Sequence, residues 1–379
     1  MRGEVKKIEV IAPHYKGAKR KEQLADNVYI TRFRYAWPHH FQNLAYGEFE
    51  KSIGYPFKVA IYAIAEFWTT LLVGLKSGPI ILNPRWMIPQ GFVGILLKPI
   101  LRCPVVVSVH GADVFTLNGW FMQRIKRFVL KHADAVVVNS TTTQKICNEW
   151  YPRDDYVICP TGADTSIFKK QVHTPSKSGN FELLFVGRMV DQKGVMYLCQ
   201  AMRILRDSGA KVHLTMAGDG AAMPKVKKYV KKYQLEDYIT LPGWVQLQDQ
   251  PEYYSIADVF VGPSIEDENG WREGFGGVFA EASAMGVPVI ASNTGGISDV
   301  VKDGVTGLLV PQKNAQALAD AIIKLKNDPE LLKKLAKAGP DFIENNYSLN
   351  VTVKKYRKIF EGLLILFVSA LSILSFSTT

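Results

Sequence analysis

Two glutamates enclose a glycine-rich run in Glu273-Gly-Phe-Gly-Gly-Val-Phe-Ala-Glu281. The glycines at 274, 276 and 277 disfavour a helix before about residue 277, so we expect Glu273 in a loop and Glu281 in the helix that follows. Carboxylates suit a diol because each accepts two hydrogen bonds, and loop amides beside a helix N-terminus favour an anion. The spacing fits an oxygen-rich, anionic ligand. The same spacing fits equally well two glutamates that bind no ligand, one in a loop and one on the solvated face of a helix.

A pair of cations follows an apolar run. Phe181–Val186 is predicted as a strand that ends at Gly187-Arg188, and Lys193 precedes a helix expected from about Val195. A glycine there lets the backbone approach a ligand, and the helix dipole favours an anion. The planar fork of Arg188 and the point charge of Lys193 suit a diphosphate. By spacing alone, two solvated cations on a surface turn are an equal alternative.

A third candidate is His110, which ends the β-branched run Pro104–His110 and is followed by glycine. A single histidine is more often structural than catalytic. Its place at the carboxyl end of a predicted strand, where α/β proteins gather ligands, strengthens the functional interpretation. The segments 217–220 and 293–296 are predicted as turns, and the second could approach a ligand through its backbone.

β-Rich runs alternate with helical patterns, which predicts an α/β fold with parallel sheets. In the first half the predicted strands are Lys7–Pro13, Val28–Phe33, Ile80–Asn83, Pro104–His110, Ala135–Asn139 and Tyr156–Cys159, and the predicted helices are Pro56–Lys76, Gln90–Leu101, Gly119–His132 and Thr141–Tyr151. In the second half the predicted strands are Phe181–Val186, Lys211–Ala217, Tyr238–Leu241, Val259–Pro263, Val287–Ser292 and Gly307–Val310, and the predicted helices are Val195–Ser208, Met223–Tyr233, Asp249–Ile256, Gly277–Ala284 and Ala315–Asn327.

The polar stretch Lys169–Asn180 carries Pro, Ser and Gly and is predicted as a linker. We expect two Rossmann-like domains, over 1–170 and 171–345, that face each other across a cleft at the carboxyl ends of their strands. Residues 346–362 are predicted as a helix that returns to the first domain. The uncharged apolar tail 363–379 is short of the ~20 residues that span a bilayer. A docked helix, an unselected extension and a membrane anchor all stay open for it.

The formal net charge of +11 favours anionic partners, such as phosphorylated molecules or acidic lipid, and no nucleic-acid-binding motif accompanies it. The helix expected at 119–132 carries Arg124, Arg127 and Lys131 on one face and apolar residues on another. It can pack on a core or make peripheral contact with an acidic membrane. The four cysteines lack metal or disulfide spacing and the N-terminus lacks a signal peptide, which together indicate a cytoplasmic protein.

In their order along the chain these motifs resemble the GT-B retaining glycosyltransferases of family 4, over about residues 5–361. In the second half the matching segments are Gly187-Arg188 with Lys193-Gly194, Ala217–Gly220, Pro263-Ser264, the two glutamates, Gly286–Ile290, Gly295-Gly296 and Asp303–Val310. In the first half they are Pro89–Gly91, His110–Asp113, Ala133–Ser140 and Pro160–Asp164, where Thr161 and Ala163 depart from the family's pattern. Each motif is weak alone, and the ordered set is specific.

The resemblance implies a role for each candidate residue. Arg188 and Lys193, beside Gly187, would neutralise the leaving diphosphate, and His110 would lie beside the donor sugar across the cleft. The remaining residues would hold a nucleoside-diphosphate-sugar donor: Glu281 its ribose, Val245 its base, and Glu273 with the backbone of Gly274, Phe275, Gly276 and Gly277 its sugar. The resemblance also implies no cofactor, no metal and no covalent nucleophile, because side chains and a helix dipole do the electrostatic work.

One departure lies ahead of the strand predicted at Lys7–Pro13. Family members usually begin with another strand, a glycine-rich loop and a helix, and this unit is not found here. Its absence would leave the first sheet with unpaired strand edges. Three functions stay open: a glycosyltransferase acting on a lipid-linked, polysaccharide or other glycoconjugate acceptor, a nucleotide-sugar epimerase of the same fold, and a non-catalytic donor-binding relative. A dehydrogenase is disfavoured because no Gly-x-Gly-x-x-Gly follows a strand.

Overall fold

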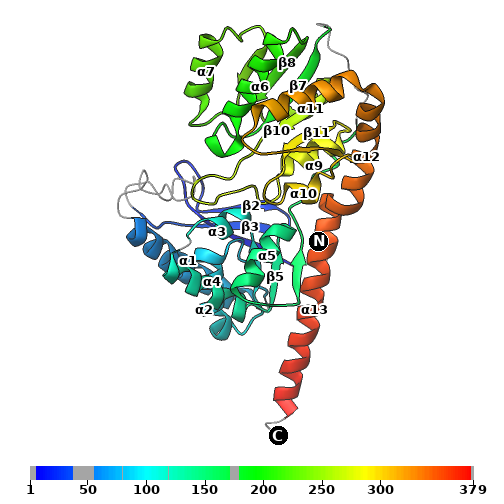
Figure 1. The fold of residues 1–379 in the computed structure, drawn as a ribbon. Helices are drawn as coiled ribbons and strands as arrows, with labels where there is room; N and C mark the ends of the chain where they lie inside the picture. Colours follow the sequence, from blue (N-terminus) through cyan, green and yellow to red (C-terminus); the bar gives the residue numbers. More distant parts are fainter. Residues whose placement is uncertain (1–5, 37–54, 79, 118, 171–178, 377–379) are drawn as a thin grey trace.

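The computed structural model describes residues 6–36, 55–78, 80–117, 119–170 and 179–376. Figure 1 shows two α/β lobes, with the final helix running from the upper, C-terminal lobe along the lower, N-terminal one. The centre of the predicted linker and the last residues of the predicted tail lie outside the described residues. All four cysteines are buried, as their apolar character predicts.

The C-terminal lobe contains a six-stranded parallel sheet in the order β12-β11-β10-β7-β8-β9. Its strands are β7 (Phe181–Val186), β8 (Val212–Ala217), β9 (Ile239–Gly243), β10 (Val259–Gly262), β11 (Val289–Ser292) and β12 (Gly307–Val310). The central strands β10 and β11 are buried throughout, because helices cover both faces of a parallel sheet. The strand order reverses between β7 and β10, and in open α/β sheets ligands bind at the carboxyl ends of the strands at such a point.

Apolar faces of the helices build a core on each side of this sheet. The helices are α6 (Val195–Asp207), α7 (Met223–Lys232), α8 (Gln250–Ile256), α9 (Gly277–Ala284), α10 (Ile297–Val300) and α11 (Ala315–Asn327). Nearly every strand and helix predicted for this half is found within two or three residues of its predicted bounds, because short apolar strands and 3.6-residue periodicity are strong sequence signals.

The strands of the N-terminal lobe fall into two separate three-stranded sheets, β1-β3-β2 and β4-β5-β6. Their strands are β1 (Ile8–Pro13), β2 (Lys21–Ala25), β3 (Val28–Phe33), β4 (Val106–Val109), β5 (Ala135–Val138) and β6 (Tyr156–Ile158). β2 was not predicted from the sequence, because its residues are mostly polar. The strand expected at Ile80–Asn83 is reduced to an isolated bridge between Leu82 and Val105.

The helical elements of this lobe are α1 (Tyr55–Ser77), η3 (Met87–Gly91), α2 (Phe92–Leu101), α3 (Gly111–Phe115), α4 (Trp120–His132) and α5 (Thr141–Trp150). α1, α2 and α4 gather on one side of the lobe (Figure 1). The buried helical side chains around β4 and β5 come from η3, α2 and α4, and also from α3 and α5. α1 is also the one described helix that is long and apolar enough to cross a membrane, over Phe57–Ser77.

Two long helices close the chain, α12 (Pro329–Tyr347) and α13 (Leu349–Phe376). α12 was not predicted from the sequence, because Pro340 interrupts its helical pattern. Its buried residues Leu335, Gly339 and Ile343 nevertheless recur on one face. The boundary expected at residue 362 is wrong, since one continuous helix runs on to Phe376. α13 contacts the N-terminal lobe: the Tyr356 hydroxyl lies 2.7 Å from the Ser108 hydroxyl.

Candidate active site

The loop after β10 packs against the short helix η4 (Asp191–Lys193) in the C-terminal lobe. The Ile265 amide donates a hydrogen bond to the Gln192 carbonyl at 2.9 Å. A Cβ at Gly194 would lie 1.8 Å from the Pro263 carbonyl oxygen, so only glycine permits this approach. Because the two segments lie so close, Lys193 at the end of η4 reaches Glu273, near the end of the loop that follows β10.

Lys193 and Glu273 form an ion pair there, between the ammonium nitrogen Nζ and the carboxylate oxygen Oε2. Their side chains are only 17% and 13% exposed, so water screens the pair weakly. The Lys193 Nζ also lies 6.0 Å from the centre of the Trp271 ring, within cation–π range. The two residues predicted for the diphosphate and for the donor sugar are therefore in direct contact.

Arg188 follows β7 at the same edge of the sheet, after Gly187. Its side chain is exposed and forms no ion pair with any residue that the structure describes. Two cations thus stand near the N-terminus of α6, which no side chain caps. One of them is neutralised by Glu273 and the other is free to meet an anion.

The loop that carries Glu273 is held between the lobes by close backbone contacts. The Gly296 amide donates to the Glu273 carbonyl at 2.9 Å. A Cβ built on Gly111, directly after His110, would lie 2.8 Å from the Gly274 Cα. These contacts place His110 and Glu273 on facing loops of the two lobes, as the sequence analysis expected of a cleft.

Glycines 276 and 277 begin α9. Gly276 has a φ of +81° and a Cβ there would lie 2.3 Å from the Phe279 ring, so it serves as a left-handed entry to the helix. No side chain caps α9, which leaves its first amides open towards a ligand. Phe275 buries its ring against Tyr347 with centroids 5.3 Å apart, so only its backbone can meet a ligand. The prediction of Glu273 in a loop and Glu281 in a helix is confirmed.

Glu281 lies on α9 and accepts a hydrogen bond from the Tyr254 hydroxyl at 3.2 Å. Burial raises the pKa of this carboxyl above its ordinary value, although the Tyr254 bond opposes the shift. Val245 lies half-buried after β9, and its carbonyl is 3.4 Å from the Gln250 side-chain amide. Both residues belong to the C-terminal lobe, where the resemblance placed the ribose and the base.

His110 ends the run after β4 and is held by Asp113. The Asp113 carboxylate is buried and accepts hydrogen bonds from the amides of His110 and Met87, each at 2.8 Å. Burial raises the pKa of Asp113 to about 7, against the effect of these two bonds. Burial, with the nearby Arg85 charge, lowers the pKa of His110 to about 4. The imidazole is therefore neutral at pH 7 and can exchange hydrogen bonds without carrying charge.

Known families match the chain over most of its length. The family described as "Glycosyl transferase 4-like domain" matches residues 8–162, and "Glycosyl transferases group 1" matches residues 166–342. The chain belongs to the group 1 glycosyltransferases of the GT-B fold. This confirms the family and the fold class that the sequence motifs predicted.

Relatives of this glycosyltransferase act on different substrates, by their names. The GDP-mannose-dependent alpha-(1-6)-phosphatidylinositol monomannoside mannosyltransferase of Mycobacterium tuberculosis is 29% identical over 276 residues, 68% of this chain and 69% of that protein. Sucrose-phosphate synthase from Thermosynechococcus elongatus has a similar fold, with a TM-score of 0.78 at 20% identity over 94% of this chain and 89% of that one. Anabaena HepE, solved with UDP and glucose, has a TM-score of 0.69 at 18% identity, over 89% of this chain and 87% of that one.

Sequence reasoning missed several residues that position the site of this glycosyltransferase. In the sequence, Asp113 could be noted only as the end of the His110–Asp113 motif. No sequence pattern indicated a role for Trp271 or Tyr254. The two lobes are also joined by Thr141 and Asp299, whose side chains are hydrogen-bonded at 2.6 Å. Tyr254, Trp271 and Asp299 each lie more than 25 residues in sequence from the residue that they contact. Asp113 acts on backbone amides. Local residue spacing could reveal neither kind of contact.

Proposed function

We propose that this glycosyltransferase retains anomeric configuration and uses a nucleoside-diphosphate-sugar as donor, without metal or cofactor. The observation that carries the proposal is the cation arrangement, in which Lys193 is paired with Glu273 while Arg188 nearby is unpaired among the described residues. A diphosphate would supply a negatively charged partner for Arg188, whose guanidinium can bind it through two parallel hydrogen bonds. The uncapped N-termini of α6 and α9 add backbone donors for its oxygens.

The donor would lie along the carboxyl ends of the C-terminal strands. Glu281 accepts hydrogen bonds from the ribose hydroxyls, and Val245 lies beside the base. The Glu273 carboxylate and the first amides of α9 hold the sugar. When the diphosphate binds Lys193, Glu273 is released from part of its ion pair and can accept from sugar hydroxyls. One carboxylate thus serves the cation in the free protein and the sugar in the complex.

In the proposed reaction an acceptor hydroxyl attacks the anomeric carbon from the face that the diphosphate leaves. The new bond from carbon to acceptor oxygen forms as the bond to the phosphate oxygen breaks. The acceptor proton passes to a phosphate oxygen, so the products are a glycoside and a nucleoside diphosphate. Arg188 and Lys193 stabilise the charge that develops on the leaving group. His110, neutral at pH 7, supports the sugar by hydrogen bonding from the opposite lobe.

We infer that the acceptor is lipid-linked or a saccharide and that transfer takes place at the cytoplasmic face of a membrane. One side of the N-terminal lobe exposes large apolar side chains together with Arg124 and Arg127 of α4. The exposed apolar residues are Phe57, Ile64, Trp68, Leu72 and Leu75 of α1, Leu96 and Ile100 of α2, and Trp120, Phe121 and Phe128 of α4. Apolar anchors flanked by cations are typical of a surface that meets anionic lipid.

The donor proposal is tested by thermal unfolding with a panel of UDP-, GDP- and ADP-sugars, followed by product analysis. We expect one nucleotide class to raise the melting temperature by mass action, and the glycoside formed with a suitable acceptor to keep the donor's anomeric configuration by NMR. Epimerised donor without transfer, or an inverted product, would contradict the proposal. Nucleotide binding without any turnover would favour a non-catalytic relative.

Flotation with anionic vesicles tests the membrane contact separately. Trp68→Ser and Phe121→Ser should reduce the bound fraction, because each removes an exposed apolar anchor. Val305→Ser is the matched control, since Val305 is exposed on the opposite lobe. An equal decrease of the vesicle-bound fraction in all three variants, or no vesicle binding by the parent, would contradict a membrane-facing N-terminal lobe.

A further inference from the structure

α4 carries a lysine that is completely buried. Lys126 is 0% exposed, although Arg124 and Arg127 of the same helix are exposed. Its Nζ donates hydrogen bonds to the carbonyl of Thr116 at 2.7 Å and to that of Val114 at 3.4 Å. Burying an ammonium group costs free energy unless hydrogen bonds and nearby charges compensate for the lost water. The groups around Lys126 therefore indicate what its charge is used for.

The surroundings of the Lys126 ammonium group suit a cation. Its two carbonyl partners lie at the end of α3, where a helix leaves carbonyls without partners of its own and favours positive charge. The centre of the Trp150 ring of α5 lies 4.6 Å from Nζ, within cation–π range. Burial lowers the pKa of Lys126 to about 8, and the negative charge of Asp113 opposes this shift. The lysine thus holds the end of α3 through a charge that its neighbours support.

α3 begins directly after His110 and is bonded to it. The His110 carbonyl accepts from the Val114 amide at 3.4 Å, and the His110 amide donates to the Asp113 carboxylate at 2.8 Å. Val114 is therefore bonded to His110 through its amide and to Lys126 through its carbonyl. Lys126 fixes one end of a short helix whose other end carries His110.

The same short helix packs against the loop that follows β10. At the start of α3, a Cβ built on Gly111 would lie 2.8 Å from the Gly274 Cα, so the two backbones are in close contact. At its end, the Phe115 ring has its centre 5.4 Å from the guanidinium carbon of Arg272. Arg272 and Gly274 flank Glu273, so a shift of α3 would displace that carboxylate as well.

We propose, given the proposed donor site, that Lys126 is a positioning residue of this glycosyltransferase: its charged ammonium group fixes α3 and thereby holds His110 opposite Glu273. Lys126 does not touch a substrate, because its side chain is completely buried. The donor is held by the C-terminal lobe in the proposed function. Loss of Lys126 should therefore lower the rate of transfer and leave the affinity for the nucleoside diphosphate unchanged.

Lys126→Met tests the role of the ammonium group, since methionine keeps an unbranched side chain without charge. The probe is whichever of UDP, GDP and ADP stabilises the parent, with its sugar nucleotide as substrate. We expect kcat for release of the nucleoside diphosphate to fall at least about tenfold while its dissociation constant stays within about twofold of the parent's, by isothermal titration. Lys145→Met is the matched control, because Lys145 is an exposed lysine of the adjacent α5, and should keep the kcat of the parent.

The pH dependence of kcat in the parent tests the charge without a variant. Because the pKa of Lys126 is about 8, the ammonium group loses its charge as the pH rises through 8, and kcat should decline between about pH 8 and pH 9.5. Among the described residues, the titratable groups that act on Lys126 are Asp113 of α3 and Cys147 of α5. Burial raises the pKa of Asp113 only to about 7 and that of Cys147 far above this range, so neither accounts for the decline.

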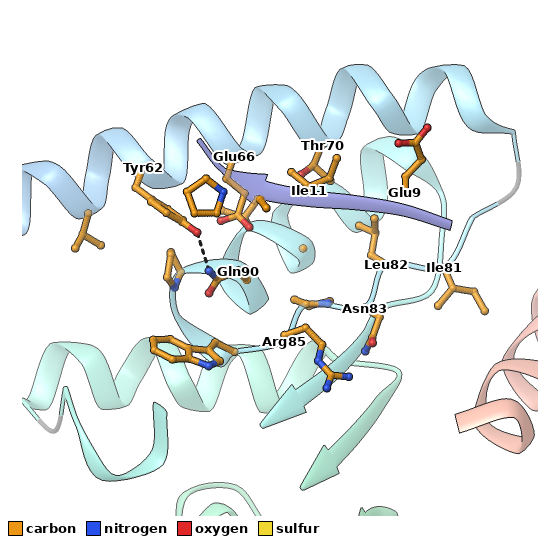
Figure 2. A pocket seen from close by; sticks show the side chains of 18 residues that line it. Glu9, Ile11, Tyr62, Glu66, Thr70, Ile81, Leu82, Asn83, Arg85 and Gln90 are labelled. Carbon is orange, nitrogen blue, oxygen red and sulfur yellow. Dashed lines mark hydrogen bonds between the residues drawn. The ribbon is translucent and has the colours of Figure 1, made fainter. Parts of the chain in front are cut away.

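Glu66 of α1 also titrates near pH 8. It lines a cavity of about 430 Å³ in the N-terminal lobe, where Figure 2 shows its side chain beside Tyr62 and Gln90. Burial raises the pKa of Glu66 to about 8. Glu66→Gln is therefore the matched control for the pH profile. It removes this titration, keeps Lys126, and should retain the decline of kcat.

An unchanged kcat in Lys126→Met, an equal loss of nucleoside-diphosphate affinity, or a parent kcat that stays level above pH 8 would overturn the role of Lys126. A decline that disappears in Glu66→Gln would overturn it as well. If Lys126→Met shows no cooperative unfolding transition, the pH profiles of the parent and of Glu66→Gln decide. A parent that neither binds nor releases a nucleoside diphosphate would contradict the proposed donor site itself.

Discussion

The ammonium group of Lys193 and the carboxylate of Glu273 are paired in a largely shielded position, although 80 residues separate them in the sequence. The pair joins the start of α6 to the loop that leads into α9. In the proposed reaction, the anionic donor at the start of α6 would compete with Glu273 for the same cation. The pair therefore fixes the positions of both side chains, and the proposed donor would have to replace the Glu273 carboxylate at Lys193.

Glu273→Gln should lower kcat by 10²–10³-fold, the range seen when one transition-state contact is lost. The amide keeps the size of the side chain but cannot neutralise Lys193 or accept two hydrogen bonds from a sugar hydroxyl pair. Donor binding should persist, because Lys193 is then free to meet the diphosphate. Steady-state kinetics with isothermal titration of the nucleoside diphosphate separates the two effects.

Lys193→Ala should weaken binding of the nucleoside diphosphate and lower kcat, because Glu273 is then left without its cation. Lys225→Ala is the matched control, since Lys225 forms an exposed ion pair with Asp191 of the neighbouring η4 at 3.4 Å. Exposed pairs contribute little, so this variant should keep its activity. Full activity of Lys193→Ala would contradict the assigned role.

Arg188→Lys tests whether geometry or charge matters at the end of β7. Lysine preserves the charge but cannot form the two parallel bonds of a guanidinium. We expect the KM for the donor to rise about tenfold, equivalent to about 1.4 kcal/mol, and a larger rise in Arg188→Ala. Equal KM values in the parent and both variants would show that Arg188 does not touch the donor.

How much the sequence could predict differs between the lobes. β7 and β12 match their predicted bounds, and so Gly187 and Arg188 were placed correctly at a strand end, because buried parallel strands are short apolar runs. β2 and the pairing at Leu82 were not predictable in this way, since polar edge segments depend on their neighbours. The Lys193–Glu273 pair was also out of reach, because no local pattern fixes contacts between distant loops.

Asp113→Asn should disturb the position of His110 without touching the donor. The Asp113 carboxylate accepts from two amides, of His110 and Met87, and the asparagine side chain has only one acceptor oxygen. One buried amide then loses its partner, which costs about 1–3 kcal/mol. We expect a lower melting temperature and a kcat that falls while the nucleoside-diphosphate affinity is kept. An unchanged kcat would show that the loop holds His110 by other contacts.

Glu66→Gln should change how stability depends on pH. Burial raises the pKa of Glu66 from 4.5 to about 8, so between these values the folded protein binds a proton that the unfolded chain has released. This contribution to stability is complete below about pH 4.5 and is lost as the pH rises through 8. At about 1.4 kcal/mol for each unit of pKa shift, the loss is on the order of 5 kcal/mol at most.

Urea unfolding of the parent and of Glu66→Gln at pH 5 and pH 8.5 measures the effect. The parent should lose free energy of unfolding between the two pH values, and the variant should lose several kcal/mol less, because glutamine stays neutral throughout. Glu149→Gln, at an exposed position, controls for the removal of one carboxylate and should follow the parent. Since the other titrating groups, including His110 and Asp113, are shared by all three proteins, parallel pH curves would show that Glu66 does not hold a proton in the cavity.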